Sequence, residues 1–382
     1  MKKIILFIFA LVLSFQTIKA QVVLDTNGVT IKWNGTSVPS NYFVQASPRG
    51  TLEWFAIVND STKNNITAYA KNIPSGRIFF TPPGSLNPIP FDNIVTSLLS
   101  NMSHMFYFAK NFNQPIGSWD VSKVTNMSGM FCDTALTSFN QPIGNWNVSK
   151  VTNMSGMFRS ATAFNQHIGS WNVGNVTNMS NMFENATAFN QPIGNWDVSK
   201  VTRMAYMFLN DTIFNQPIGN WNVSRVKNMS GMFAGNTNLS INNYDSLLIG
   251  WYARIFPENP LRPSVSFSAG NAKYCKGNLP RSFIISTYGW TITDGGMDCS
   301  TSIEELESSK VKLYPNPVIN ELNVIIDYHI IDEPYVIIDG LGRVVLEGKF
   351  KEGESTINLM ELAKGIYYLK VSDSYSSKFM KE

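Results

Sequence analysis

Hydrophobic and polar positions recur with a fixed period through the middle of the chain. A phrase of the form Phe-Asn-Gln-Pro/His-Ile-Gly-Asn/Ser-Trp-Asp/Asn-Val occurs five times, in steps of 27, 25, 25 and 25 residues. Repeats of this length each carry an apolar face that only a neighbouring copy can cover. The period therefore predicts a solenoid of stacked repeats over residues 91–250. The copies begin at Phe112, Phe139, Phe164, Phe189 and Phe214.

Within one repeat, the apolar positions predict two short elements. Ile116, Trp119 and Val121 have the spacing of a leucine-rich-repeat strand, so the last two are expected to point to one face. Met127 and the pair Met130-Phe131 lie at i, i+3 and i+4, the spacing of one face of a helical turn. We therefore predict a mixed α/β solenoid of the leucine-rich-repeat type, with a short strand and a short helix in each repeat.

One tryptophan stands in every copy of the phrase. The row could be interpreted as an aromatic box that binds a ligand. The spacing favours a buried core, because each large ring gains about 1.5–3 kcal/mol or more from burial. We therefore assign the tryptophans to the repeat core. They are Trp119, Trp146, Trp171, Trp196 and Trp221.

The polar residue between each tryptophan and the following valine is expected to point outward. In adjacent strands about 4.8 Å apart, these residues would form a ladder roughly 20 Å long. Such a ladder could bind a glycan or a protein edge, or it could only stabilise the stack. The candidate ligand-binding residues are Asp120, Asn147, Asn172, Asp197 and Asn222.

A basic column follows the ladder three residues later in each copy. Asn175 interrupts it. A column of this kind is either a solvated rim or a site for an acidic polymer. Its members are Lys123, Lys150, Lys200 and Arg225.

Outside the repeats, short β-strands are expected. Residues 21–90 contain apolar runs between turn-forming residues, typical of a β region that either caps the repeats or forms a separate domain. Residues 251–300 are expected to cap the last repeat. After a polar, acidic linker at 301–310, about seven short alternating runs in residues 311–382 predict an all-β, immunoglobulin-like sandwich.

Two parts of the chain resemble known families. Copies such as FNQPIGNWDVSKVTRMAYMF resemble the BspA-like leucine-rich-repeat family of bacterial surface proteins, over about Phe91 to Trp251. This resemblance implies adhesion or partner binding without implying one ligand. The phrases LYPNPVINELNV, YVIIDGLGRVV and LAKGIYYLKV resemble a type A sorting domain of the type IX secretion system. That resemblance implies recognition of residues 311–382 by the type IX machinery, after passage through the periplasm.

The N-terminus is typical of a cleaved export signal in residues 1–20. Lys2 and Lys3 precede an apolar run of 12 residues, shorter than the roughly 20 that span a bilayer. An uncleaved anchor is the alternative. Removing these residues lowers the formal net charge from +3 to zero, which leaves no charge-based argument for nucleic acid. We expect a secreted or surface-attached protein with no membrane span after cleavage.

Charge is distributed unevenly over the remaining chain. Residues 21–300 carry 18 Lys and Arg against 13 Asp and Glu, whereas residues 301–382 carry 9 against 14. Such an asymmetry indicates separate domains.

Side chains that support catalysis are sparse. The three histidines show no metal-ligand spacing. Asp120 and Asp197 would lie about 14 Å apart, beyond the roughly 5–9.5 Å of a glycosidase carboxylate pair. We therefore predict a binding protein that is not an enzyme and uses no cofactor or metal. The alternatives are a passive structural or display protein and a polysaccharide-active enzyme.

The cysteines point to one disulfide. Cys275 and Cys299 share a non-repetitive segment of an exported chain, where oxidising conditions favour pairing. Cys132 follows a repeat Met-Phe pair and is expected to be a small buried hydrophobe.

Overall fold

The computed structural model describes most of the chain as two compact units, Met1–Cys299 and Ser300–Glu382. The signal predicted in residues 1–20 and the linker predicted in residues 301–310 lie outside the described residues. The described residues are 22–35, 38, 42–72, 79–132, 138–255, 260–299, 311–326, 334–339, 343–350, 354–371 and 375–382.

The N-terminal region of the first unit contains two small sheets. The elements of this region are β1 (Val22–Leu24), β2 (Ile31–Trp33), β3 (Phe43–Ala46), β4 (Glu53–Asn59), α1 (Lys63–Ala70), the 3-10 helix η1 (Phe91–Asn93) and β5 (Ile94–Leu98). β1 and β2 form an antiparallel pair, and the second sheet has the order β3-β4-β5, with β4 and β5 parallel.

This region lies against the first repeat. The Ile31 amide donates to the Ser118 carbonyl at 2.8 Å, and the Trp119 indole N–H donates to the Phe91 carbonyl at 2.8 Å. One hydrophobic core runs from the N-terminal region through the repeats to the segment that follows them. The N-terminal region therefore covers the apolar end of the first repeat.

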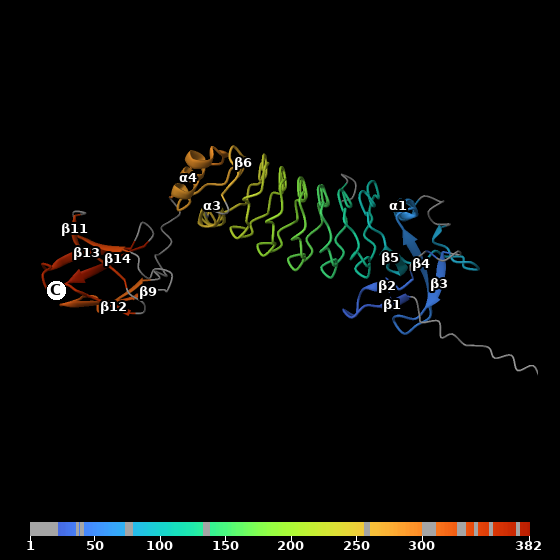
Figure 1. The fold of residues 1–382 in the computed structure, drawn as a ribbon, viewed down its shortest axis with the longest axis horizontal. Coiled ribbons are helices and arrows are strands. Elements are labelled where there is room, and N and C mark those ends of the chain that lie inside the picture. Colours follow the sequence, from blue (N-terminus) through green and yellow to red (C-terminus); the bar gives the residue numbers. More distant parts are fainter. Residues whose placement is uncertain are drawn as a thin grey trace, which may run out of the picture. The chain divides into compact units, whose positions relative to one another are not determined.

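The repeats form a row of stacked turns of the chain, which we call coils (Figure 1). In the described part of residues 99–240 there is no helix and no strand, only isolated parallel bridges between neighbouring coils. The bridges join Asn101, Asn126, Asn153, Asn178, Arg203 and Asn228 in succession. The predicted strand-plus-helix solenoid of the leucine-rich-repeat type is therefore wrong.

Tight turns explain the missing strand. The Trp146 amide donates to the Ile143 carbonyl at 3.1 Å, and the Val151 amide donates to the Val148 carbonyl at 2.9 Å. Each bond closes a turn of four residues, so the Trp-x-Val segment between the turns is too short for a ladder. Both side chains nevertheless point inward, because Trp146 and Val148 are buried.

Left-handed residues explain the missing helix. The segment predicted as a helical turn contains Gly129 with φ of 59°, and the same position in later coils is occupied by Gly156, Asn181 and Tyr206, with φ of 60°, 59° and 58°. A right-handed helix cannot pass through such a residue. The Met and Phe side chains are buried because consecutive turns, rather than a helix, direct them inward.

Aromatic rings stack along the coils. Phe131, Phe158, Phe183 and Phe208 follow one another with ring centroids 5.5–5.7 Å apart and nearly parallel planes. All five repeat tryptophans are buried. The rows hold successive coils together by burial and ring contact, so none of these rings is offered to a ligand.

The segment after the repeats packs on the last coil. The Phe233 amide donates to the Ser268 carbonyl at 3.0 Å, and Asp245 accepts the backbone N–H groups of Cys275, Lys276 and Gly277 at 2.8–2.9 Å. A disulfide joins Cys275 to Cys299. The elements are α3 (Ile241–Ala253), β6 (Ser266–Ser268), α4 (Asn278–Tyr288) and β7 (Thr291–Thr293), with β6 and β7 parallel.

The second unit is all-β in its described residues, which confirms the all-β character predicted for residues 311–382. Its strands are β8 (Val311–Tyr314), β9 (Glu321–Ile326), β10 (Pro334–Asp339), β11 (Val344–Lys349), β12 (Glu354–Asn358), β13 (Gly365–Val371) and β14 (Tyr375–Lys381). They form two sheets with the orders β11-β10-β13-β14 and β12-β9-β8, and both sheets contribute to one core.

Candidate ligand-binding surface

The five predicted ligand-binding residues, which we call the Asx row, all make the same local hydrogen bond. In each, Oδ1 accepts the backbone N–H of the residue two positions later, at 3.0–3.2 Å. This is the Asx-turn geometry that Asn and Asp favour. The row therefore shapes the turn of each coil, whatever else it does. Its members are Asp120, Asn147, Asn172, Asp197 and Asn222.

Exposure differs along the Asx row. Asn147, Asn172 and Asp197 are exposed, and Asn222 is half-buried. Asp120 is buried, because the N-terminal region covers it: the Thr96 hydroxyl donates to the Asp120 carbonyl at 2.9 Å. The prediction that all five side chains face solvent is therefore wrong at Asp120, and the accessible part of the row is its middle.

Asp197 is the only carboxylate among the exposed members of the Asx row. Hydrogen bonds from the hydroxyl and amide of Ser199, with a smaller contribution from Lys200, lower the pKa of Asp197 below its ordinary value. Asp197 is therefore ionised at neutral pH. Together with Asn147 and Asn172 it presents one anionic and two neutral amide groups.

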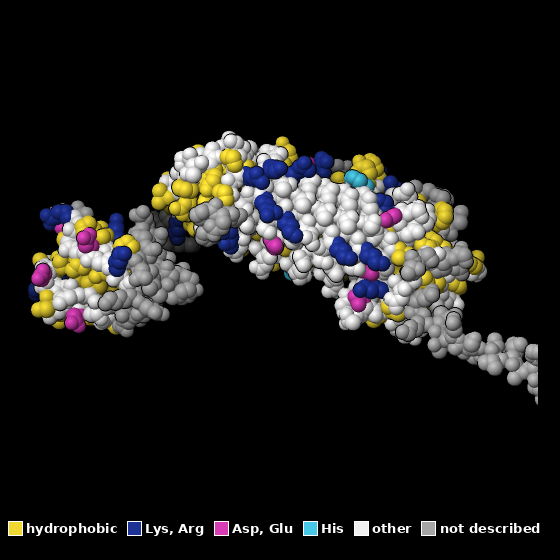
Figure 2. Space-filling view, in the orientation of Figure 1, with side chains coloured by type: hydrophobic (Ala, Val, Ile, Leu, Met, Phe, Trp, Pro, Cys, Tyr) yellow, Lys and Arg dark blue, Asp and Glu magenta, His cyan; other side chains and the backbone are white. Residues whose placement is uncertain are grey.

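The basic column predicted from the sequence lies on the surface, and we call it the basic row. Lys123, Lys150, Lys200 and Arg225 are all exposed, and no salt bridge involves them in the described part of the chain. The Lys200 ammonium donates to Asn175 Oδ1 at 2.7 Å. Figure 2 shows Lys and Arg side chains along the coils on a face that is otherwise mostly polar and uncharged.

The Asn and Gln of the repeated phrase have a structural role that the sequence analysis did not assign. Asn140 Oδ1 accepts the Asn165 amide at 3.0 Å and the Gln166 side-chain N–H at 2.9 Å, so two groups of the next coil bond one side chain. The same pair recurs between later coils. The indole N–H of Trp171 also donates to the preceding coil, to Ile143 O at 3.2 Å. These polar groups therefore hold neighbouring coils together through hydrogen bonds.

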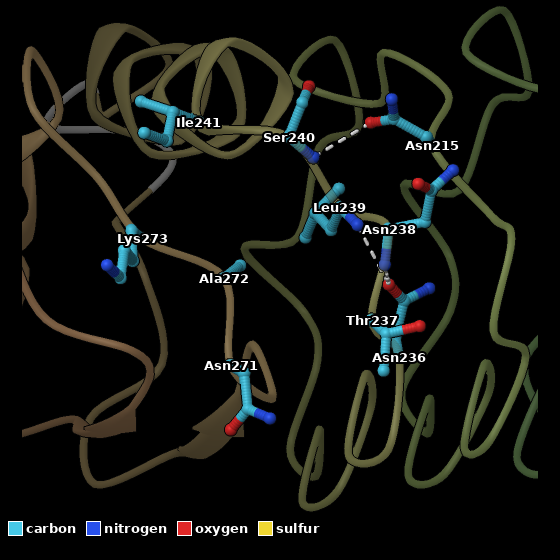
Figure 3. Close-up of a pocket in the computed structure, with 10 residues that line it drawn as sticks. All are labelled: Asn215, Asn236, Thr237, Asn238, Leu239, Ser240, Ile241, Asn271, Ala272 and Lys273. Atoms are coloured by element: carbon cyan, nitrogen blue, oxygen red, sulfur yellow. Dashed lines mark hydrogen bonds between the residues drawn. The ribbon is translucent and has the colours of Figure 1, made fainter. Parts of the chain in front are cut away.

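An open cavity of about 390 Å³ lies where the last coil meets the segment after the repeats. Figure 3 shows residues 236–240 on one side, residues 271–273 on the other, and Ile241 on the helix above Lys273. Its hydrogen bonds are internal: Asn215 Oδ1 accepts the Ser240 amide at 3.0 Å, and Asn236 Oδ1 accepts the amides of Asn238 and Leu239 at 2.9 Å. Lys273, on its rim, pairs with Asp298 at 2.8 Å. The cavity lining is therefore largely satisfied without a ligand.

Asp211 is a buried carboxyl inside the stack. It is fully inaccessible, and neither carboxyl oxygen has a hydrogen-bond partner in the described structure. Burial raises the pKa of Asp211 to about 8, although the nearby amides of Ile213 and Phe214 oppose the rise. The same position holds Ala161 and Ala186 in the two preceding coils. Because this carboxyl is inaccessible to solvent, it bears on stability rather than on ligand binding.

The C-terminal part of the chain matches a known family. Residues 312–382 match the family model of a secretion system C-terminal sorting domain. The chain carries a secretion sorting domain. This implies that the protein is secreted or displayed at the outer-membrane surface. Among the described residues, no helix combines the length and the apolar character needed to cross a membrane.

The repeats match a second family model. Residues 78–190 and 166–257 match DUF285, described as a Mycoplasma protein of unknown function. The match supports repeats of one kind across this region, and it does not test their resemblance to the BspA-like family. No curated protein and no solved structure matches the chain.

Proposed function

We propose that this protein is exported by the type IX machinery through residues 311–382. We further propose that it binds an extended glycan or protein ligand outside the cell through the exposed side of its coils. Adhesion to a surface is the activity that such binding serves. The resemblance of the repeats to BspA-like surface proteins supports the setting, although the coils lack leucine-rich-repeat geometry.

The observation that carries this proposal is the repetition of polar groups on an exposed surface. Asn147, Asn172 and Asp197 recur at the same position in successive coils, and neighbouring coils are joined by parallel bridges. Bridged backbones lie about 4.8 Å apart, and the nearly parallel rings of Trp146 and Trp171, next to Asn147 and Asn172, lie 6.5 Å apart, so equivalent groups repeat at roughly 5–6.5 Å. A ligand that repeats along its own length can form the same contact several times, which raises affinity without any deep pocket.

We also propose that the protein is not an enzyme. Asp120 is buried, and Asp197 is the one exposed carboxylate of the Asx row. Hydrolysis of a glycosidic bond by two carboxyl groups requires both of them at the substrate, roughly 5–9.5 Å apart. The geometry of the Asx row does not provide such a pair.

Binding to glycan and protein arrays tests the proposal. We expect the purified chain to bind a polymeric ligand more tightly than a short fragment of that ligand. Asn172→Ala should weaken binding, since it removes an exposed amide. Asn236→Ala, which changes a buried amide inside the stack, is the control for an effect through stability alone. Thermal unfolding of each variant shows whether it is folded at the assay temperature.

The competing function is a passive structural or display protein. Under that alternative the only role of the Asx row is to stabilise the turn of each coil, through the hydrogen bond that each side chain accepts from the backbone two residues later. Absence of reproducible binding across broad arrays, with a folded protein, would favour the passive role over ours.

A further inference from the structure

The basic row places like charges side by side on the exposed surface of the stack. Lys123 and Lys150 occupy one position in adjacent coils, as do Lys200 and Arg225. Like charges at neighbouring positions of bridged backbones repel each other. Asn175 shows that a neutral residue fits the position, because it donates to Ser149 O at 2.8 Å and accepts from Lys200. The fold therefore does not require a cation at this position, and the row is available to a ligand.

Acidic side chains do not neutralise the row. In the described repeats, Glu184 pairs with Arg159 at 3.0 Å, and Asp120 and Asp211 are buried. Asp197 is exposed and lies near Lys200, where it offsets a single charge. The exposed surface around the row is therefore positive, in agreement with the dark-blue side chains and few magenta ones of Figure 2.

The spacing of the row fits a linear polyanion. Five equivalent positions on successive coils extend over roughly 19–26 Å, taking the 4.8 Å between bridged backbones and the 6.5 Å between the rings of Trp146 and Trp171 as the limits of one step. Four of these positions carry a cation and the middle one, Asn175, carries an amide. An extended chain with regularly spaced anionic groups can contact all five positions at once, whereas a single small anion would contact one or two.

The neighbouring residues indicate the kind of polyanion. The Asx row, three residues before the basic row, offers Asn147 and Asn172, whose amides can bond hydroxyl groups. Single-stranded nucleic acids bind to exposed aromatic rings on which the bases stack. The Asx and basic rows contain no aromatic residue, and the repeat tryptophans are buried. Hydroxyl and acidic groups on one extended chain are the chemistry of an acidic polysaccharide.

We infer that the ligand of the coils is an acidic polysaccharide, carrying carboxylate or sulfate groups, and that the basic row binds it. This inference rests on the proposed function, since it names the class of extended ligand. Asn147 and Asn172 contact the sugar hydroxyls, and the cations contact the acidic groups. The partners are exposed and solvated, so binding depends on many weak contacts and falls as salt rises.

The experiment measures affinity of the full exported chain for polygalacturonate, dextran sulfate and neutral dextran of matched length, over a series of salt concentrations. An exposed ion pair contributes about 1.5- to 5-fold in affinity. The triple variant Lys123→Gln, Lys150→Gln and Arg225→Gln should therefore weaken binding of the acidic polymers by about 3- to 150-fold. The reverse change, Asn175→Lys, should tighten binding by about 1.5- to 5-fold.

A matched control removes the same charge elsewhere. Lys110→Gln, Arg262→Gln and Lys276→Gln change three exposed cations of the same types outside the row, and should leave affinity nearly unchanged. Equal weakening by both triples, or no gain from Asn175→Lys in a folded protein, would overturn the inference. Tighter binding of a poly-dT strand than of polygalacturonate would identify a nucleic acid instead.

The outcomes separate this inference from the proposed function. Binding of neutral dextran that salt and the triple variant leave unchanged would overturn the acidic class while keeping an extended glycan ligand. Failure to bind any of the polymers, together with no binding on protein and glycan arrays, would overturn both this inference and the proposed function.

Discussion

Replacing Asp211 should stabilise the protein, and by an amount that depends on pH. The carboxyl is buried without a hydrogen-bond partner in the described structure, and its pKa is raised to about 8. In the next coil, Asn236 occupies the equivalent position and bonds fully: it accepts two amides and donates to the carbonyls of Asp211 and Phe214. An amide at residue 211 therefore fits a site that this fold already builds, and Asp211→Asn is the change to make.

The magnitude follows from the two pKa values. An aspartate in the unfolded chain has a pKa of about 3.9, and each unit of difference between the states corresponds to about 1.4 kcal/mol. Because the folded pKa is raised, the unfolded state loses its proton first. Stability is highest below about pH 4 and falls as pH rises toward 8. At pH 7 the penalty is about 4 kcal/mol, and at pH 5 about 1.5 kcal/mol, both as upper bounds.

Urea unfolding of the wild-type and Asp211→Asn proteins at pH 5, 7 and 8 measures this effect. The variant should be more stable at each pH, and its advantage should grow by about 2–3 kcal/mol between pH 5 and pH 7. Asp211→Ala, which copies Ala161 and Ala186, is the control for loss of the charge without a new hydrogen bond. An advantage that does not change with pH, or a variant less stable at pH 8, would refute the reasoning.

Three further predictions concern the stack and its export. Trp171→Ala should cost about 3–5 kcal/mol and broaden the urea transition, because a buried ring in the middle of the coils is lost; an unchanged transition would contradict the core role. Gly169→Ala should cost about 1–3 kcal/mol, since its Cβ would lie 2.3 Å from Pro192 O. At Gly174 the nearest atoms to an added Cβ belong to side chains, at 3.2 and 3.3 Å. Gly174→Ala should therefore lower the free energy of unfolding clearly less than Gly169→Ala does, in the same urea experiment. Deleting residues 311–382 should leave the protein in the periplasm, as cell fractionation would show; normal surface delivery would argue against sorting by this domain.

The period of the sequence was sufficient to predict which side chains are buried. Trp171 and Val173 point inward as their spacing indicates, because stacking buries the same positions in each coil whatever the backbone conformation. The local elements could not be predicted in the same way. Met127 and Met130-Phe131 have helical spacing, but the left-handed residue at Gly129 replaces a helix by turns. Tyr206 at the same position of another coil conceals that signal, since Tyr rarely adopts such a conformation.

The candidate surface was predicted in part. The basic row and the exposed Asn147, Asn172 and Asp197 lie where an outward-facing position was expected. Asp120 is hidden because a distant segment, including Thr96, packs over it, and no local pattern reports such a contact. The hydrogen bond between Asn140 and the next coil depends on the distance between the coils. A sequence pattern does not give that distance, so this bond could not be predicted either. Asp211 had a usable signal, a charge where Ala161 and Ala186 stand in the coils before it.

Lysine labelling read by mass spectrometry tests the central claim most directly. The full chain is treated with an amine-reactive reagent, with and without saturating polygalacturonate. The account predicts that the polymer protects Lys123, Lys150 and Lys200, while Lys110 and Lys276 react as before. Protection confined to Lys273 at the cavity beyond the last coil, or equal labelling of every lysine when the polymer is bound, would contradict a ligand lying along the basic row.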